Sequence, residues 1–393
     1  MTFFVIGIGN KQSIFSEEQK ELIQSTTVFS GGKRHLELVK NVLPENYQWI
    51  FIQSPMETVF KEYEQANTRI VVFASGNPLF YGFSNTLKNK YPSIEIYTEP
   101  YFSSIQVLAN KTNTNSNELI TVSVHGRTWK ALDIALINQK SLIGVLTDRI
   151  KSPKAIAERL LNYGYTNYEI SIGEDLEGEY EKVQTITLEE ALNKEYHKLN
   201  CVLLHQKEKR KEYFGIKDGD FLGLKGRPKM ITKMPIRLTS LHLLDVLNRN
   251  VFWDIGFCTG SISVEAKLKN PNLDIIAFEK RLECESILME NQKRFGALGI
   301  TSVIGDFFKQ DLKQYPKPDT IFIGGHGGKL KEMLIVLDEV ISPNTIIVIN
   351  TVKETSNNSF KESCKNLAWE LVEELNLTLD LHNPICLLKA IKL

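Results

Sequence analysis

Residues 251–261 read Val-Phe-Trp-Asp-Ile-Gly-Phe-Cys-Thr-Gly-Ser, an apolar run that passes directly into a turn with two glycines. The segment from Ser261 onward reads SISVEAKLK and is typical of a helix. Glycine allows the backbone to approach a ligand where a Cβ atom would collide. This stretch therefore predicts a strand, a ligand-facing turn and a helix, the repeating unit of an α/β domain.

Two carboxylates follow at matching places in the next units of this pattern. Glu279 ends the second expected strand, 19 positions after Gly260, and Asp306 follows the third strand. The carboxyl ends of parallel strands meet at one edge of a sheet, where an acid after the second strand commonly holds ribose hydroxyls. Together with the motif Asp-x-Gly-x-x-x-Gly, the two acids predict a nucleoside site.

This constellation resembles the class I methyltransferases, which use S-adenosylmethionine (SAM). The resemblance implies that the glycine turn lies against the methionine part of SAM, that Glu279 holds the ribose, and that residues after the third strand border the adenine. The SAM-binding residues implied in this half are Thr232, Asp254, Gly256, Cys258, Thr259, Gly260, Glu279, Asp306 and Phe307. The alternatives are a turn without a ligand and a nicotinamide dinucleotide site, but a strict Gly-x-Gly-x-x-Gly is absent.

Cys258 stands where that family usually has a small residue. A thiol in such a turn is either a reactive nucleophile or a packed small side chain. Because free cysteines are most often simply buried, we expect the second.

The chain as a whole alternates short β-branched or aromatic runs with amphipathic, helix-length stretches, which predicts two α/β blocks with parallel strands. In the first block we expect a helix at 153–163 and strands at 3–8, 49–52, 69–74, 95–97, 119–123, 141–146, 169–173 and 201–204. In the second block we expect strands at 251–254, 274–278, 302–304, 320–323, 345–350, 377–381 and 385–391.

Between the blocks the composition shifts. Residues 207–237 hold ten basic and four acidic side chains together with several glycines. We expect domains at 1–207 and 226–393, joined by a linker at 208–225. One interpretation is a solvated connection; the other is that four cations face a cleft for a ligand with several carboxylates. Those cations are Arg227, Lys229, Lys233 and Arg237.

The first block has signals of its own. Gly7 and Gly9 end the first strand, and Ser75-Gly76-Asn77-Pro78 forms a turn after the strand at 69–74. With Pro100 to Ile105, Val122 to Arg127 and Thr147-Asp148-(x)4-Pro153, these motifs resemble the tetrapyrrole methylases. That resemblance implies two α/β subdomains with SAM in the cleft between them. The implied SAM-binding residues are Gly7, Gly9, Ser75, Gly76, Asn77, Ser103 and Ser104, with Asn10 and Asn77 replacing the usual Pro and Asp.

The pairing of the two halves resembles one family more specifically. A tetrapyrrole methylase followed by Gly226-Arg227-Pro228-(x)3-Thr232-Lys233, by the glycine turn and by Pro318 to Gly325 is similar to the precorrin-6Y C5,15-methyltransferases (decarboxylating). The resemblance implies a cobalamin-pathway enzyme. Its first domain would methylate C5 of the tetrapyrrole, and its second would methylate C15 and release the C12 acetate carboxyl group. It also implies a homo-oligomer, because tetrapyrrole methylases are commonly dimers.

Three side chains are expected to face the substrate. His326 lies in the loop Gly-Gly-His-Gly-Gly at 324–328, after the fourth strand, and is a candidate proton carrier. Lys233 and Arg237 are candidates to bind acetate and propionate groups. For His326 the alternative is a flexible loop with a solvent-facing ring, and for the cations it is an ordinary surface charge.

Composition excludes several classes. Lys plus Arg and Asp plus Glu both number 47, so the net charge is zero, which argues against nucleic acid as a partner. No apolar run approaches the roughly 20 residues that span a bilayer, so we expect no membrane association. Five distant cysteines without a Cys-x-x-Cys pair favour the cytoplasm. His197, Cys201 and His205 are rejected as a metal site, because on a strand four residues span about 13 Å.

Two other functions stay open at this stage. A class I domain can also methylate RNA, although the zero net charge and the first block argue against it. A nicotinamide-dependent reductase, with the first block as a binding module, is the alternative outside the methyltransferases.

Overall fold

The computed structural model describes residues 1–11, 14–227, 230–379 and 384–393. The chain forms two compact units that interleave along the sequence. Unit 1 comprises Met1–Thr128, Lys140–Glu158 and Asn167–Glu208, and unit 2 comprises Trp129–Gln139, Arg159–Thr166 and Lys209–Leu393. Strands and helices alternate in both units, so the predicted α/β class is confirmed. The domain bounds at 207 and 226 stay a prediction.

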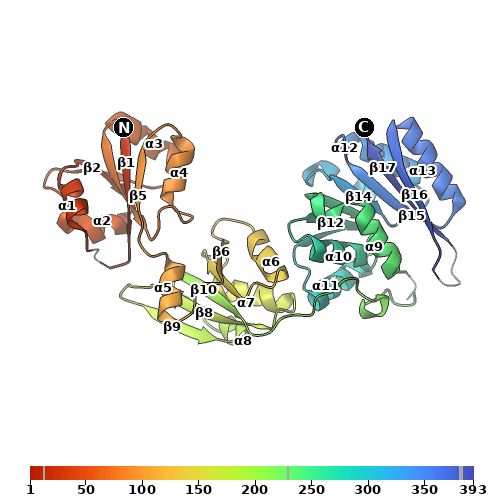
Figure 1. Cartoon of the computed structure of the whole chain (residues 1–393), viewed down its shortest axis with the longest axis horizontal. Coiled ribbons are helices and arrows are strands. Elements are labelled where there is room, and N and C mark those ends of the chain that lie inside the picture. Colours follow the sequence, from red (N-terminus) through yellow and green to blue (C-terminus); the bar gives the residue numbers. More distant parts are fainter. Residues whose placement is uncertain (12–13, 228–229, 380–383) are drawn as a thin grey trace. The chain divides into compact units, whose positions relative to one another are not determined.

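Unit 1 begins with a fully parallel sheet of order β3-β2-β4-β1-β5 (Figure 1). Its central strands are buried on both faces, which explains their continuous apolar runs. Helices α3 and α4 cover one face, and α1 and α2 cover the other. The elements are β1 (Thr2–Ile8), α1 (Glu17–Gln24), β2 (Val28–Gly31), α2 (Lys33–Val39), η1 (Lys40–Val42), β3 (Gln48–Phe51), α3 (Met56–Ala66), β4 (Arg69–Ser75), α4 (Phe83–Lys90) and β5 (Ile96–Glu99).

The second sheet of unit 1 has the order β6-β7-β10-β8-β9. Only β6 and β7 pair in parallel, so the prediction of parallel strands is wrong for this sheet. The cause is that β8 and β9 form a hairpin, and β10 then inserts antiparallel between β7 and β8. The elements are α5 (Ser104–Lys111), β6 (Leu119–Ser123), β7 (Leu142–Leu146), α7 (Pro153–Asn162), β8 (Tyr168–Glu174), β9 (Lys182–Ile186), α8 (Leu188–Leu192) and β10 (Asn200–Gln206).

Unit 2 is built on a seven-stranded sheet of order β13-β12-β11-β14-β15-β17-β16, antiparallel only at β17. The strand order reverses between β11 and β14, the point at which open α/β sheets form a ligand crevice. Its strands are β11 (Val251–Ile255), β12 (Asp274–Glu279), β13 (Ile300–Ile304), β14 (Thr320–Ile323), β15 (Ile346–Thr351), β16 (Trp369–Leu377) and β17 (Ile385–Lys392). The strand expected at 377–381 is wrong, since β16 ends at Leu377, and 380–381 lie outside the described residues.

The helices of unit 2 cover both faces of this sheet (Figure 1). Helices α9, α10 and α11 pack on one face, and α12 and α13 on the other. The helical elements are α6 (Lys130–Ile137), η2 (Asp218–Asp220), α9 (Met234–Leu243), η3 (Val246–Asn248), α10 (Ser261–Lys269), α11 (Glu283–Phe295), η4 (Phe307–Lys309), η5 (Leu312–Gln314), α12 (Leu330–Val340) and α13 (Glu354–Asn366).

The expected linker is part of the core of unit 2. Ile216, Phe221 and Leu224 are buried in the same cluster as the residues of α9 and α10. The interpretation as a solvated connection is therefore wrong for this stretch. Its glycines and charges suggested a linker, whereas its three apolar side chains decide the packing.

Arg237 corrects a second expectation, because it does not face a substrate. The side chain is 0% exposed, and its guanidinium donates to the carboxylates of Glu265 and Asp218. It also donates to the backbone carbonyls of Ile216 and Thr232. A buried guanidinium is tolerated only when its donors are paired in this way. Arg237 therefore fastens the segment before α9 to helix α10.

The Glu265→Gln variant tests this network. It leaves the Arg237 charge buried with weaker partners, so we expect the free energy of unfolding to fall by about 3–5 kcal/mol in urea titrations. The control is Glu362→Gln, which breaks the exposed pair with Lys331 and should change stability little. Equal effects of both variants would contradict a dominant role for the buried network.

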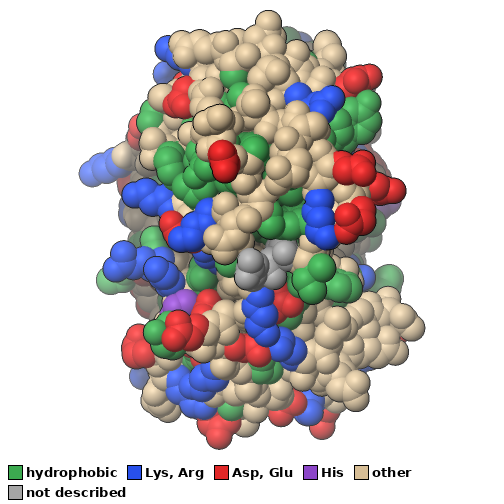
Figure 2. All heavy atoms as spheres, turned by 90° about the vertical axis from the view of Figure 1, so that its left-hand side faces the viewer, with side chains coloured by type: hydrophobic (Ala, Val, Ile, Leu, Met, Phe, Trp, Pro, Cys, Tyr) green, Lys and Arg blue, Asp and Glu red, His purple; other side chains and the backbone are tan. Residues whose placement is uncertain are grey.

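The surface shows no dominant charge on the face that Figure 2 presents. Lys and Arg side chains are interspersed there with Asp and Glu side chains and with small hydrophobic patches. Within the described ranges, none of the helices has the length and apolar character needed to cross a bilayer.

Candidate functional site

The turn after β11 packs directly against the loop after β14, backbone to backbone. Gly256 has φ +81°, and a Cβ atom there would lie 2.6 Å from the backbone nitrogen of Gly325. Any other residue at 256 would push the two turns apart. Gly256 is thus required both by its close approach to Gly325 and by its positive φ angle.

Gly260, the second glycine of the motif, serves a different purpose. A Cβ atom there would lie 2.2 Å from Cδ1 of Leu288 on α11. Gly260 therefore permits α10 and α11 to pack closely, and it is not part of the cavity wall described next.

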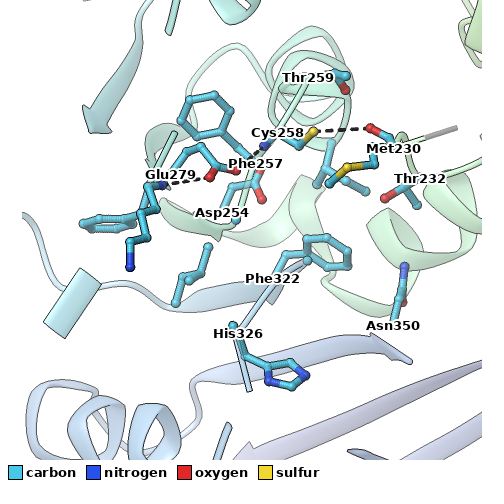
Figure 3. Close-up of a pocket in the computed structure, with 18 of the residues that line it drawn as sticks. Met230, Thr232, Asp254, Phe257, Cys258, Thr259, Glu279, Phe322, His326 and Asn350 are labelled. Atoms are coloured by element: carbon cyan, nitrogen blue, oxygen red, sulfur yellow. Dashed lines mark hydrogen bonds between the residues drawn. The ribbon is translucent and has the colours of Figure 1, made fainter. Parts of the chain in front are cut away.

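A cavity of about 680 Å³ opens at the carboxyl edge of the sheet. The ends of β11, β12, β13 and β14 line one side, and residues 230–233 before α9 line another together with Ile236 in its first turn. Figure 3 shows Asp254, Glu279 and Cys258 around the turn, with Thr232 and His326 on other parts of the wall. The predicted residues brought together here are Thr232, Lys233, Asp254, Gly256, Cys258, Thr259, Glu279, Asp306, Phe307 and His326.

Asp254 is the most strongly perturbed group in the cavity. Its side chain is buried, and Ser263 donates to Oδ2 while Oδ1 has no partner among the described residues. Burial, with a smaller contribution from Glu279, raises the pKa of Asp254 to about 7. A buried carboxylate oxygen without a donor is costly, so the site is built to receive a donor from a ligand.

Glu279 is held in a fixed orientation at the end of β12. Its Oε1 accepts from the backbone amides of Lys280 (2.8 Å) and Arg281 (3.1 Å). Its Oε2 accepts from the backbone amide of Cys258 (3.1 Å), and the Arg281 guanidinium lies 3.3 Å away. Three backbone amides and the Arg281 guanidinium thus occupy the lone pairs of both oxygens, so a hydroxyl group binds this carboxylate only by replacing the long contacts of Arg281.

Cys258 has the environment of a packed thiol. Its Sγ donates to the backbone carbonyl of Met230 (3.3 Å). Burial first, and then Glu279, raises the pKa of the thiol. A nucleophilic cysteine needs a lowered pKa, so the packed interpretation is favoured here.

His326 and Lys233 are the two candidate substrate-facing groups that remain. The Nδ1 atom of His326 is buried and has no partner in the described part of the chain. Burial, and then the Lys353 ammonium, lowers the pKa of His326 below its ordinary 6.5, so the ring is neutral at pH 7. Lys233 lies on the wall with its Nζ 3.5 Å from the Asp218 carboxylate. Arg227 is exposed and contacts Met230, and Lys229 lies outside the described residues.

Asn350 is a wall residue that the sequence analysis missed. It lies in β15, and its side-chain amide donates to Ser240 on α9 (2.9 Å). The available signal was its position near the carboxyl end of a correctly predicted strand, the same rule that pointed to Glu279.

In unit 1 the predicted residues gather at the carboxyl edge of the first sheet. A Cβ atom on Gly7 would lie 2.2 Å from the carbonyl oxygen of Gly76, so the turns after β1 and β4 are adjacent. Gly9 is similarly close to Tyr101 and Glu177. Asn77 caps its own turn by accepting from the amide of Leu79 (3.0 Å).

The two serines differ from the other predicted residues of unit 1. The Ser103 hydroxyl caps helix α5 by accepting from the amide of Gln106. The Ser104 hydroxyl contacts the buried Cys201 thiol. Their side chains therefore serve the helix and the core, which leaves the backbone at the start of α5 as their contribution to a ligand site.

Comparison with known proteins decides the family. A family model described as a precorrin methyltransferase domain matches residues 226–377. A precorrin-6Y C(5,15)-methyltransferase (decarboxylating) from Sinorhizobium is 31% identical over 354 residues, which are 88% of this chain and 84% of that protein. The chain belongs to the precorrin-6Y C(5,15)-methyltransferase (decarboxylating) family. The resemblance and the fold class inferred from the sequence motifs are thereby confirmed.

Two shorter relatives carry single activities in their names. A cobalt-precorrin-7 C(5)-methyltransferase from Salmonella typhimurium is 26% identical over 205 residues, 52% of this chain and 98% of that protein. A cobalt-precorrin-6B C(15)-methyltransferase (decarboxylating) from the same organism is 32% identical over 115 residues, 29% of this chain and 58% of that protein. The family thus has relatives whose names divide the two methylations between separate proteins.

The Asp254→Asn variant tests the free-energy cost of burying the Asp254 carboxylate. Because the folded state holds the Asp254 proton up to about pH 7 and the unfolded chain only to 3.8, wild-type stability is lost as pH rises through that window. Asn keeps the bond from Ser263 without a charge. We expect the free energy of unfolding of the variant, measured in urea relative to the wild type, to rise between pH 4 and pH 8 by no more than about 4 kcal/mol. An advantage independent of pH would contradict the raised pKa.

Proposed function

We propose that this protein transfers methyl groups from SAM to C5 and C15 of a corrin precursor and removes the C12 acetate carboxyl group. The observation that carries the proposal is the cavity at the carboxyl edge of unit 2, where the unpartnered Asp254 oxygen, the Gly256 turn and Glu279 converge. Family membership supports the same reaction. Asp306 and Phe307 would complete the adenine side of the site.

The residues of the cavity fit SAM. Glu279 would bind a ribose hydroxyl in place of its long contacts to the Arg281 guanidinium, and the unpartnered oxygen of Asp254 would accept from a donor such as an ammonium group. The missing side chain of Gly256 lets the turn approach the backbone of Gly325, which also lines the cavity. SAM supplies an electrophilic methyl group on a sulfonium, so no nucleophilic side chain is required of the protein. The turn acts by positioning and by excluding water.

The remaining chemistry of unit 2 is the movement of protons and carboxylates. A meso carbon that gains a methyl group loses a proton, and neutral His326 on the cavity wall would accept it. Loss of carbon dioxide breaks one C–C bond of the acetate, and its electron pair enters the conjugated ring before a proton is returned. Lys233 is placed to bind a ring carboxylate by charge.

For the N-terminal half we propose C5 methylation by residues 1–207. The Salmonella C(5)-methyltransferase matches this chain over 205 residues, close to the length of the proposed domain. The match includes 98% of that relative. Gly7, Gly9, Ser75, Gly76 and Asn77 would form the SAM site together with the start of α5.

The other functions are less well supported. The zero net charge does not favour an RNA substrate. We also propose a cytoplasmic location and a homo-oligomer. The five cysteines without a disulfide suit a reducing compartment.

Calorimetric titration of S-adenosylhomocysteine into the full chain tests the proposal. We expect two sites in the wild type and one in the Glu279→Lys or Gly256→Trp variant, because a cation or a bulky ring displaces the ligand in unit 2. The control is Glu362→Lys, the same charge reversal on an exposed helix, which should keep both sites. No site in the wild type, with binding of a nicotinamide dinucleotide instead, would favour the reductase.

The His326→Gln variant tests the proton carrier. We expect release of carbon dioxide and C15 methylation to slow by about 100-fold or more, while S-adenosylhomocysteine binds as before. In the wild type the rate should fall as pH drops through a value below 6.5, because protonation removes the base. The variant should lack this limb of the pH profile. An unchanged profile would remove His326 from the mechanism.

A further inference from the structure

A polar cluster in unit 1 has no role in the proposal above apart from Ser75. Arg34 and His35 lie in the first turn of helix α2, and Ser75 ends β4. The Nη2 atom of Arg34 lies 2.8 Å from the Ser75 hydroxyl, and Nε2 of His35 lies 2.9 Å from it. Two neighbouring side chains of α2 therefore meet a side chain 40 residues further along the chain, at the carboxyl edge of the first sheet.

The hydrogen bonds fix the tautomer of His35. The backbone amide of Gly32 donates to Nδ1 of the ring (3.2 Å), so Nδ1 is an acceptor and the proton is on Nε2. Burial, and then the Arg34 charge, lowers the pKa of His35 to about 4, against a smaller opposing effect of the Phe73 carbonyl. The ring is thus neutral near pH 7, and it donates toward Ser75.

The direction of the Ser75 hydroxyl follows from this tautomer. A hydroxyl oxygen accepts two hydrogen bonds and donates one. Here the Arg34 and His35 N–H groups occupy both acceptor positions. The structure gives the hydroxyl hydrogen no acceptor among the described residues, and Ser75 is exposed. Ser75 therefore presents a donor to a ligand.

Arg34 adds an uncompensated charge beside that donor. Its guanidinium also donates to Oδ1 of Asn10, and among the described residues its other three N–H groups have no acceptor. Within the described residues Arg34 makes no ion pair. The acid whose charge acts on it is Asp175, and that carboxylate is already bonded to the Asn10 amide (3.2 Å) and to the backbone amide of Tyr180 (3.0 Å).

We propose that Arg34, His35 and Ser75 form a binding site for a carboxylate of the ligand. Adjacent N–H and O–H donors with one positive charge match the two oxygens of a carboxylate. This inference rests on the proposed function, which supplies two sources of that group: the methionine part of SAM and the acid side chains of the tetrapyrrole. His35 is a positioning residue, since it acts by orienting the Ser75 hydroxyl.

The experiment uses the full chain with Glu279→Lys, so that the binding measured is that of unit 1. The probes are S-adenosylhomocysteine, its analogue without the carboxyl group, and uroporphyrin III as a tetrapyrrole with carboxylates. The test variants are Arg34→Gln and Ser75→Ala, with Arg34→Lys retaining charge but not the forked geometry. The control is Lys33→Gln, which removes a neighbouring exposed charge. Thermal unfolding checks that each variant is folded.

We expect Arg34→Gln and Ser75→Ala each to weaken one carboxylate-bearing probe by about 10- to 100-fold, and Arg34→Lys to fall between them and the parent. Weaker S-adenosylhomocysteine with an unchanged carboxyl-free analogue identifies the cofactor as the source. Weaker uroporphyrin alone identifies the tetrapyrrole.

Two results would overturn the site. In one, the test variants bind both carboxylate probes as the parent does, which leaves the proposed function intact. In the other, Lys33→Gln has the same effect as Arg34→Gln, so that only general charge matters. A parent that binds none of the probes would instead remove the proposed function of the N-terminal half, and this site with it.

Discussion

The contact between two backbone turns, Gly256 after β11 and Gly325 after β14, is the constraint on which the cavity of unit 2 depends. With no side chain between them, the strand ends on either side of the switch point come close enough to serve one ligand. The amide of Cys258 then reaches Glu279, so the same turn also fixes the carboxylate at the end of the neighbouring strand. The conformation of the turn at Gly256 therefore also determines the position of Glu279.

The opposite wall of the cavity depends on a buried charge. Arg237 joins helix α10, through Glu265, to the backbone of the segment that carries Thr232 and Lys233. An apolar contact would hold that segment without fixing its register. The four hydrogen bonds of the planar guanidinium, at fixed angles, specify both its distance and its direction. Arg237, which was expected to bind substrate, instead holds the cavity-wall segment in place from the buried side.

The sequence predicted those parts of the fold and site that follow from local pattern. Asp254, Glu279 and His326 were found because each lies in or just after a predicted strand, and parallel strands share an edge. Arg237 was misassigned because its partner lies 28 residues further along the chain, where no local pattern pairs them. The same limit hid the partners of Ser75, which lie about 40 residues earlier. Antiparallel insertion of β10 was missed because periodicity gives no strand direction.

The interleaving of the two units has a consequence for how the chain is made. Unit 2 takes residues 129–139 and 159–166 from the middle of the first half and the rest from after residue 209. On the ribosome, the two early segments emerge long before the strands of their own unit exist. Unit 2 can be completed only near the end of translation. A protease that cuts near residue 208 would leave unit 1 whole in the N-terminal fragment, but the C-terminal fragment would lack two segments of unit 2.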